Sequence, residues 1–305
     1  MARYIVGDII RHWREQAGIT VEELAGGKID PTTLWRIEEG HSMPGKDTLE
    51  YLFQSLGLDP NSLTTVFLDN KFAETQMLTD KLDRHLTNRN PNEASKLINE
   101  LEQKKGFMKN KFNVQYILAA KASLATIEGV NPLDVIKMLE EAFVVTRHNY
   151  REDKISTYFL SRVDFNVFNM IAINYSEMGE YKKAIFILQQ LLENVKTHFA
   201  DRIERGRRYP CVIYNLSKDL LILERHDEVI KLCEEGKDVC LETDSLRLLP
   251  LIMAHKAFSL LALGERDECL RLLNEVHGTL MLRDKYSSVK KIKDYAAERG
   301  IILDW

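Results

Sequence analysis

The sequence predicts an all-α protein. It holds 15 Gly and 7 Pro among 305 residues, a share well below the average of about 12% for these two helix breakers. From Asp69 onward apolar residues recur with the helical period, and no strand-like alternation stands out. The apolar share of 45% is sufficient to fill a core, which argues against a disordered chain. We therefore expect helices throughout.

Short helices with clear end signals fill the first seventy residues. A first helix is expected over Gly7–Gln16. Thr20 and Glu23 have the spacing of a capping box, in which each side chain satisfies the free backbone N–H of the other residue. This box predicts a second, short helix over Val21–Ala25.

A third and a fourth helix are expected to follow. Asp30 is a good N-cap and Pro31 suits the first helical position, so the third helix runs from Pro31 to about Glu39. Asp47 is expected to cap the fourth helix. Two short helices joined by a tight turn, packed by a preceding and a following helix, form the helix-turn-helix arrangement.

Four motifs mark these helices. They read Gly7-x-x-Ile10-Arg11-x-x-Arg14, Thr20-x-x-Glu23-Leu24-Ala25, Thr33-Leu34-Trp35-Arg36-Ile37-Glu38-x-Gly40 and Leu49-x-x-Leu52-x-x-x-Leu56. Over residues 3–60 they closely resemble the lambda-repressor-like (XRE-type) DNA-binding domain. The resemblance implies that the helix from Pro31 enters the major groove of double-stranded promoter DNA.

The resemblance also implies which side chains contact DNA. Thr32, Thr33 and Arg36 are expected to reach base edges and phosphates, and Trp35 to pack on the sugar-phosphate backbone or on a neighbouring helix. Phosphate contacts that hold the register without reading sequence are expected from three further cations, Arg11, Arg14 and Lys28.

The charge of this segment is unusual for a DNA-binding domain. Residues 1–69 hold six Lys or Arg and eleven Asp or Glu, a net charge of −5, whereas such domains are usually basic. Val21 and Pro31 stand where the family commonly carries Gln, so the usual bidentate adenine contact is absent. A protein-docking module without DNA binding is therefore the alternative.

A repeated pattern occupies the rest of the chain. Its clearest copy reads Phe168-Asn169-x-Ile171-Ala172-x-x-Tyr175-x-x-x-Gly179-x-Tyr181-x-x-Ala184, which resembles a tetratricopeptide repeat (TPR). Equivalent positions lie 41, 49, 45 and 40 residues apart, at Ala94, Val135, Ala184, Val229 and Cys269. Because each helix pair needs a neighbour to bury its second face, about five TPR-like pairs are predicted to stack into a right-handed superhelix. A last helix, about Tyr286–Arg299, is expected to cap the array.

The first helix of each pair is expected to face the concave side, where an extended ligand would lie. Asn side chains donate and accept at once, as a peptide backbone does, and Arg or Lys side chains pair with carboxylates. The candidate ligand contacts are Tyr158, Arg162, Asn166, Asn169, Arg208, Tyr214, Asn215 and Lys218. The alternative for Asn169 is a helix-packing role, because Asn is often found at that position of such repeats.

Patterns typical of catalysis, metal binding and membrane insertion are missing from the sequence. It contains no H-E-x-x-H, G-x-S-x-G, P-loop, G-x-G-x-x-G or C-x-x-C pattern. We expect no enzymatic activity, no cofactor and no metal. The longest apolar run, Leu248–Ala254, is too short for the roughly 20 residues that span a bilayer. Asp8 interrupts any N-terminal signal segment, so a cytoplasmic protein is expected.

The order of the two parts, a helix-turn-helix over residues 1–65 and repeats over residues 66–305, resembles the RRNPP family, the group of Rgg, PlcR, PrgX and ComR. The resemblance covers the whole chain. It implies a cytoplasmic transcription factor of Gram-positive quorum sensing that binds promoter DNA as a homodimer and is switched by a short signalling peptide in the groove of its repeats. Asn166, Asn169 and Asn215 would then hold the peptide backbone. The alternative is a DNA-binding or scaffold protein whose repeats dock a protein partner, without a peptide signal.

Overall fold

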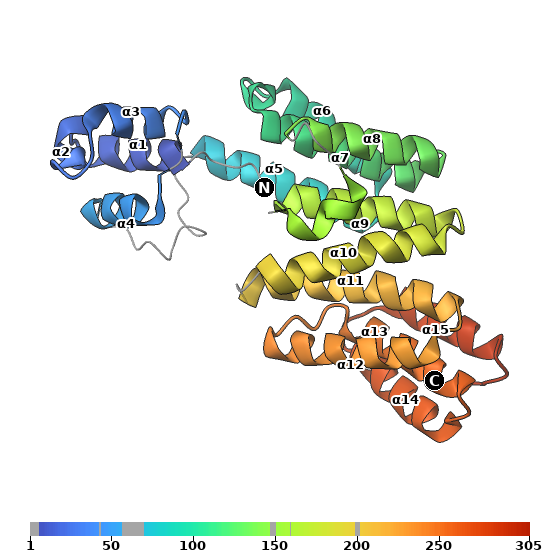
Figure 1. Cartoon of the computed structure of the whole chain (residues 1–305). Helices are drawn as coiled ribbons and strands as arrows, with labels where there is room; N and C mark the ends of the chain where they lie inside the picture. Colours follow the sequence, from blue (N-terminus) through green and yellow to red (C-terminus); the bar gives the residue numbers. More distant parts are fainter. Residues whose placement is uncertain (1–5, 43, 57–69, 147–150, 159, 199–201) are drawn as a thin grey trace. The chain divides into compact units, whose positions relative to one another are not determined.

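The computed structural model describes residues 6–42, 44–56, 70–146, 151–158, 160–198 and 202–305. These residues form α-helices and short 3₁₀ segments, and none of them lies in a strand (Figure 1). The predicted all-α fold class is confirmed. The chain divides into two compact units, Met1–Ile127 and Glu128–Trp305. The predicted domain boundary between residues 65 and 66 lies outside the described residues.

Four short helices begin the first unit: α1 (Val6–Gln16), α2 (Val21–Ala25), α3 (Pro31–Glu38) and α4 (Lys46–Ser55). Their apolar faces meet in one small core, formed by Ile10, Leu24, Ala25, Leu34, Ile37, Leu52 and Phe53. The helix-turn-helix predicted from the motifs is α2, the following turn and α3.

Side-chain caps start α2 and α3 as predicted. The backbone N–H of Glu23 donates to Thr20 Oγ1 at 3.1 Å, and the N–H of Thr20 donates to Glu23 Oε2 at 2.6 Å, which completes the capping box. Asp30 Oδ1 accepts the N–H of Thr32 at 2.8 Å. The predicted cap at Asp47 is wrong, because α4 begins at Lys46 and Asp47 lies inside its first turn.

The backbones of α1 and α3 touch at Gly7. A Cβ atom at this position would lie 1.8 Å from the carbonyl oxygen of Ile37 and 2.8 Å from the Cα of Glu38. A separation this short is far inside van der Waals contact. The glycine in the first motif is therefore required by the close approach of the two helices.

Three longer helices complete the described part of the first unit: α5 (Asn70–Thr87), α6 (Pro91–Gln103) and α7 (Lys111–Glu128). A buried tyrosine ties α7 to α5, since the hydroxyl of Tyr116 lies 3.1 Å from the carbonyl oxygen of Thr79 and 2.9 Å from Asp83 Oδ1. The N-terminus of α6 is capped by Asn90.

The second unit continues with helices α8 (Pro132–Val144), α9 (Arg162–Glu177), α10 (Tyr181–His198), α11 (Arg202–Ile222), α12 (His226–Glu242), α13 (Leu249–Ala262), α14 (Arg266–Met281) and α15 (Tyr286–Ala297). From α8 to α15 each helix packs against the next one along the chain, and α11 also packs against α9 and α13 (Figure 1). The helices α9, α11 and α13 are thus the first helices of consecutive pairs, and α10, α12 and α14 are the second ones.

The repeat register predicted from the sequence is confirmed by burial. The five equivalent positions fall on α6, α8, α10, α12 and α14, and all five side chains are fully buried: Ala94, Val135, Ala184, Val229 and Cys269. A small or medium side chain at each position lets the paired helix approach closely.

A proline inside α11 is compensated from a neighbouring loop. Pro210 has no N–H, so it cannot donate the helical hydrogen bond to the carbonyl oxygen of Gly206. The hydroxyl of Ser245, in the loop between α12 and α13, donates to that oxygen instead. Arg202, at the start of α11, reaches the end of α12, where its Nε donates to the carbonyl oxygen of Glu242 at 2.6 Å.

Ser245→Ala is expected to lower the free energy of unfolding of the second unit by about 1–2 kcal/mol, because the carbonyl of the buried Gly206 loses its donor. The control is Thr279→Ala, since Thr279 Oγ1 also donates to a helix carbonyl, that of Glu275, at 2.9 Å. The control keeps the backbone bond to that carbonyl and should change stability by less than about 0.5 kcal/mol. Urea unfolding of both variants measures the difference, and equal effects would contradict the compensation.

Candidate functional sites

The outer face of α3 carries the predicted base-reading side chains. Thr32, Thr33 and Arg36 are exposed, and Trp35 has 49% of its surface exposed. The Trp35 ring lies 5.9 Å from the ring of His41, at a tilt of 56°. The helix therefore presents hydroxyl, guanidinium and indole groups to solvent on the side that the motifs assign to DNA.

Lys28 lies in the turn between α2 and α3 and is exposed. Its Nζ is 4.8 Å from the centre of the Tyr51 ring. A cation over a ring face keeps its charge and its donors, so this position is suited to the phosphate contact predicted for it.

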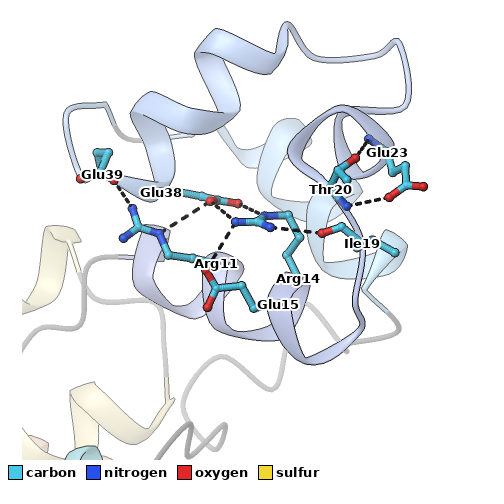
Figure 2. Close-up of polar contacts among 8 residues, drawn as sticks. All are labelled: Arg11, Arg14, Glu15, Ile19, Thr20, Glu23, Glu38 and Glu39. Carbon is cyan, nitrogen blue, oxygen red and sulfur yellow. Dashed lines mark hydrogen bonds and ion pairs between the residues drawn. The ribbon is translucent and has the colours of Figure 1, made fainter.

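Arg14 is held by hydrogen bonds inside the four-helix bundle. Its Nε and Nη2 donate to the two oxygens of Glu38 at 2.7 and 2.8 Å, and its Nη1 donates to the carbonyl oxygen of Ile19 at 3.1 Å (Figure 2). Glu38 is 2% exposed and the Arg14 side chain 13%. The hydrogen bond from Glu38 raises the pKa of Arg14 above its usual value. This bidentate pair fastens α1 to α3 and competes with the predicted phosphate contact.

Arg11 is closer to solvent than Arg14. Its Nη2 donates to Glu39 Oε1 at 2.6 Å, and its Nε lies 3.7 Å from Glu38 Oε2 (Figure 2). Among the Lys and Arg side chains described within residues 6–56, Arg11 and Arg14 are therefore ion-paired, and Lys28 and Arg36 are not.

The structure brings together Asn169 of α9 and Asn215 of α11. Asn215 Nδ2 donates to Asn169 Oδ1 at 3.0 Å. Each amide keeps one further group, the Nδ2 donor of Asn169 and the Oδ1 acceptor of Asn215. We call these two residues the amide pair.

Around the amide pair the structure places residues that the sequence did not single out. Ser176 Oγ donates to Asp219 Oδ1 at 2.6 Å, and both residues are buried. Burial raises the pKa of Asp219, although Ser176 and Lys218 oppose the shift. The helical stripe of Asn169 reaches Ser176 at i+7, and that of Asn215 reaches Asp219 at i+4, so extending the two stripes would have found them.

Lys218 and Tyr214 lie beside these residues on α11. Lys218 Nζ is 3.4 Å from Asp219 Oδ1. The Tyr214 ring stacks on His255 of α13, with centroids 5.1 Å apart. Ser217 Oγ lies 2.8 Å from His255 Nδ1. Burial and the charge of Lys218 lower the pKa of His255 to about 4, so this ring is neutral near pH 7.

Arg208, another predicted ligand contact, is committed within the fold. Its Nη2 donates to Glu204 Oε2 at 2.9 Å and its Nη1 to the carbonyl oxygen of Leu160 at 3.2 Å. Its guanidinium lies 5.3 Å from the centre of the Phe165 ring. Burial lowers its pKa. These contacts indicate a structural role for Arg208 and compete with the ligand contact predicted for it.

The remaining predicted residues lie near the start of α9. Arg162 is its first residue and is half-buried, and Asn166 is exposed. The carbonyl oxygen of Tyr158 accepts from Asn194 Nδ2 at 2.6 Å, and the Tyr158 ring lies 6.2 Å from the Phe143 ring. Tyr158, Arg162 and Asn166 thus lie on or just before the helix that carries half of the amide pair.

Within the described ranges, no three His, Cys, Asp or Glu residues gather in a way that would hold a metal ion. Nor is any helix in those ranges long and apolar enough to cross a membrane.

Comparison with known proteins gives structural matches alone. No family model matches the chain, and no curated protein matches it by sequence. Bacillus thuringiensis PlcR, solved with the peptide PapR7 and DNA, matches with a TM-score of 0.65 at 17% identity, over 94% of this chain and 99% of PlcR. This chain has the PlcR fold.

Two further solved structures share the PlcR fold. ComR from S. thermophilus, in complex with DNA and its signalling peptide ComS, matches with a TM-score of 0.58 at 15% identity, over 97% of this chain and all of ComR. The SHP pheromone receptor Rgg2 of Streptococcus dysgalactiae matches with a TM-score of 0.55 at 14% identity, over 96% and 99% of the two chains. The family resemblance read from the motifs is thus confirmed at the level of the fold.

Proposed function

We propose that this chain is a transcription regulator of the RRNPP family, which binds promoter DNA through α3 and is switched by a short signalling peptide bound by its repeats. The observation that carries the proposal is the match to PlcR over nearly the full length of both chains, since PlcR was solved with a peptide and DNA together. A match confined to the repeats would support only a protein-docking role.

The DNA-binding part of the proposal rests on the outer face of α3. Thr32 and Thr33 at its N-terminal end and Arg36 one turn later provide donors for base edges and phosphates. Lys28 adds a phosphate contact from the preceding turn. Arg14 is left out of the proposed interface, because Glu38 holds it.

The peptide-binding part rests on the amide pair. Its remaining donor and acceptor match the C=O and N–H of one residue of an extended chain, which point to the same side, so an extended peptide across α9 and α11 is the ligand they suit. Arg162 and Lys218, on the same two helices, favour a carboxylate on the peptide.

We further propose a cytoplasmic homodimer. Apolar side chains are exposed near the turn between α14 and α15, where Leu282 is 89% exposed, Tyr286 59% and Met281 38%. Because exposed apolar patches mark protein–protein contacts, we assign the contact with a second copy to this turn. Light scattering of the purified chain measures the oligomeric state.

One experiment tests DNA binding and peptide switching together. The full-length chain is used to select duplexes from a random-sequence library, and its affinity for the selected duplex is measured with and without synthetic peptides that tile the short open reading frames next to its gene. A cognate peptide is expected to change DNA affinity at least about fivefold, the usual lower range for coupling between two sites.

The alternative is a protein whose repeats dock a partner protein without a peptide signal. The net charge of −5 over residues 1–69 and the ion pairs of Arg11 and Arg14 favour it. Duplex binding with no effect of any tiled peptide would support a constitutive DNA-binding protein, and no duplex binding at low salt would support the scaffold.

The amide pair gives a sharper prediction. Asn169→Ala and Asn215→Ala should each weaken binding of the cognate peptide about tenfold, because a peptide N–H or C=O loses its partner. Gln189→Ala, which removes an exposed amide on α10, should change peptide affinity less than twofold. Isothermal titration measures affinity and thermal melting measures fold. A lower melting temperature of Asn169→Ala with unchanged peptide affinity would instead show that Asn169 contributes to helix packing.

A further inference from the structure

An acidic side chain stands on the helix face proposed to meet DNA. Thr32, Arg36 and Glu39 are spaced at i, i+4 and i+7, so they form one stripe along α3 and its C-terminal cap, and all three are exposed. The first two are proposed DNA contacts. A carboxylate on the same stripe repels phosphate, and the buried bond that joins α1 to α3 is made by Glu38 and Arg14, not by Glu39.

The partner of Glu39 is itself a predicted phosphate contact. Arg11 Nη2 donates to Glu39 Oε1 at 2.6 Å, whereas the approach of Arg11 to Glu38 is a longer one, at 3.7 Å. The two side chains of the short pair are 32% and 39% exposed. An ion pair with this much solvent around it is weak and is screened by salt. A DNA phosphate brought to this face therefore competes with Glu39 for the same guanidinium.

We propose that Glu39 limits the affinity of this domain for DNA by holding Arg11 away from phosphate. The inference rests on the proposed DNA-binding function and names the residue that sets its strength. With Glu39 in place, a phosphate must displace the Glu39 carboxylate from Arg11. It then lies close to that carboxylate, and the two negative charges repel each other. Contacts outside a selected site are then too weak to hold the protein, and the acid excess of this segment acts to suppress non-specific binding.

The test uses the full-length chain and a fluorescein-labelled 30-base-pair duplex of random sequence, with binding followed by anisotropy from about 20 to 200 mM salt. Four proteins are compared: the native chain, Glu39→Gln, Arg11→Gln and the double variant. Glu15→Gln is the matched control, because it also removes one exposed carboxylate from this domain. The Glu15 carboxylate makes a longer ion pair, 3.8 Å from Arg14 Nη2.

Glu39→Gln is expected to raise affinity for random duplex about three- to tenfold at the lowest salt. Because Arg11 gains a phosphate, the slope of log affinity against log salt should steepen by about 0.9. In the Arg11→Gln background the gain should fall to twofold or less, without steepening. Glu15→Gln should change affinity less than twofold. Thermal melting should be the same for all variants within a few degrees, since the altered groups are solvated.

Three kinds of result would overturn the proposal, and each rejects a different part of it. Equal affinities for the native chain and Glu39→Gln would remove Glu39 from the control of binding. An undiminished gain in the Arg11→Gln background, or an equal gain from Glu15→Gln, would show a general charge effect that does not pass through Arg11. No duplex binding by any of the proteins at the lowest salt would reject the proposed DNA-binding function itself.

Discussion

Gly7→Ala is expected to separate α1 from α3 and to abolish duplex binding. The added methyl group would lie 1.8 Å from the carbonyl oxygen of Ile37 and 2.7 Å from its carbonyl carbon, and both are backbone atoms of a packed helix that have no rotamer to change. Overpacking against side chains typically costs 1–3 kcal/mol, and a rigid backbone is expected to exceed about 3 kcal/mol. A four-helix bundle of this size has little stability beyond that.

Amide hydrogen exchange followed by mass spectrometry resolves this effect along the chain. Protection over residues 6–56 should be lost in Gly7→Ala, whereas residues 160–198 and 202–305 keep theirs. Gly278→Ala is the matched control: it is also a helical glycine, and a Cβ there meets no described atom outside its own helix within 4 Å. This change should be neutral or stabilising by up to about 1 kcal/mol. Intact protection of α1 and α3 in Gly7→Ala would contradict the close approach.

Arg14→Gln is expected to be nearly as damaging, for an electrostatic reason. It leaves the carboxylate of Glu38, which is 2% exposed, without its two charge-assisted hydrogen bonds. Removing one partner of a buried ion pair typically costs about 3–5 kcal/mol, since the remaining charge is shielded from water and has no opposite charge to compensate it. Arg11 Nε, at 3.7 Å from Glu38 Oε2, is too distant for a hydrogen bond and does not replace the two that are lost.

Arg11→Gln supplies the contrast, because it removes a guanidinium from the same helix but breaks a solvated pair. We expect it to lower the free energy of unfolding by less than about 1 kcal/mol. A double variant, Arg14→Met with Glu38→Met, should recover most of the loss, as apolar replacements of buried pairs often do. Urea unfolding of the three variants, monitored at Trp13 and Trp35, measures the series. Equal effects of the two single changes would show that the Arg14 pair is no more buried in solution than that of Arg11.

The elements of this fold were largely predictable from local patterns. The capping box at Thr20 and Glu23 involves residues three apart, and the equivalent repeat positions from Ala94 to Cys269 follow from helical periodicity. In both cases the information lies within one helix or one repeat, so the sequence displays it directly. The predicted cap at Asp47 is wrong because α4 begins at Lys46, two residues before the start that this cap implies, which is within the usual uncertainty of helix ends.

The roles of single side chains were harder to predict, because they depend on partners distant in sequence. Arg14 and Glu38 are 24 residues apart and Arg208 reaches Leu160 across 48, so a cation that looks available in sequence is occupied in the fold. The contact between Asn169 and Asn215 spans 46 residues. Periodicity predicts both on stripes that would face a ligand, but only the packing of α9 on α11 makes them neighbours.

The amide pair bears on the entropy of recognition. A free asparagine on a helix surface samples several rotamers, and a ligand that needs one of them must order it on binding. Here each amide already fixes the other through the bond between Asn215 Nδ2 and Asn169 Oδ1. That ordering is completed when the chain folds. A ligand using the two remaining groups meets a rigid template, so a rise in temperature should weaken its binding less than it would for a site of mobile side chains.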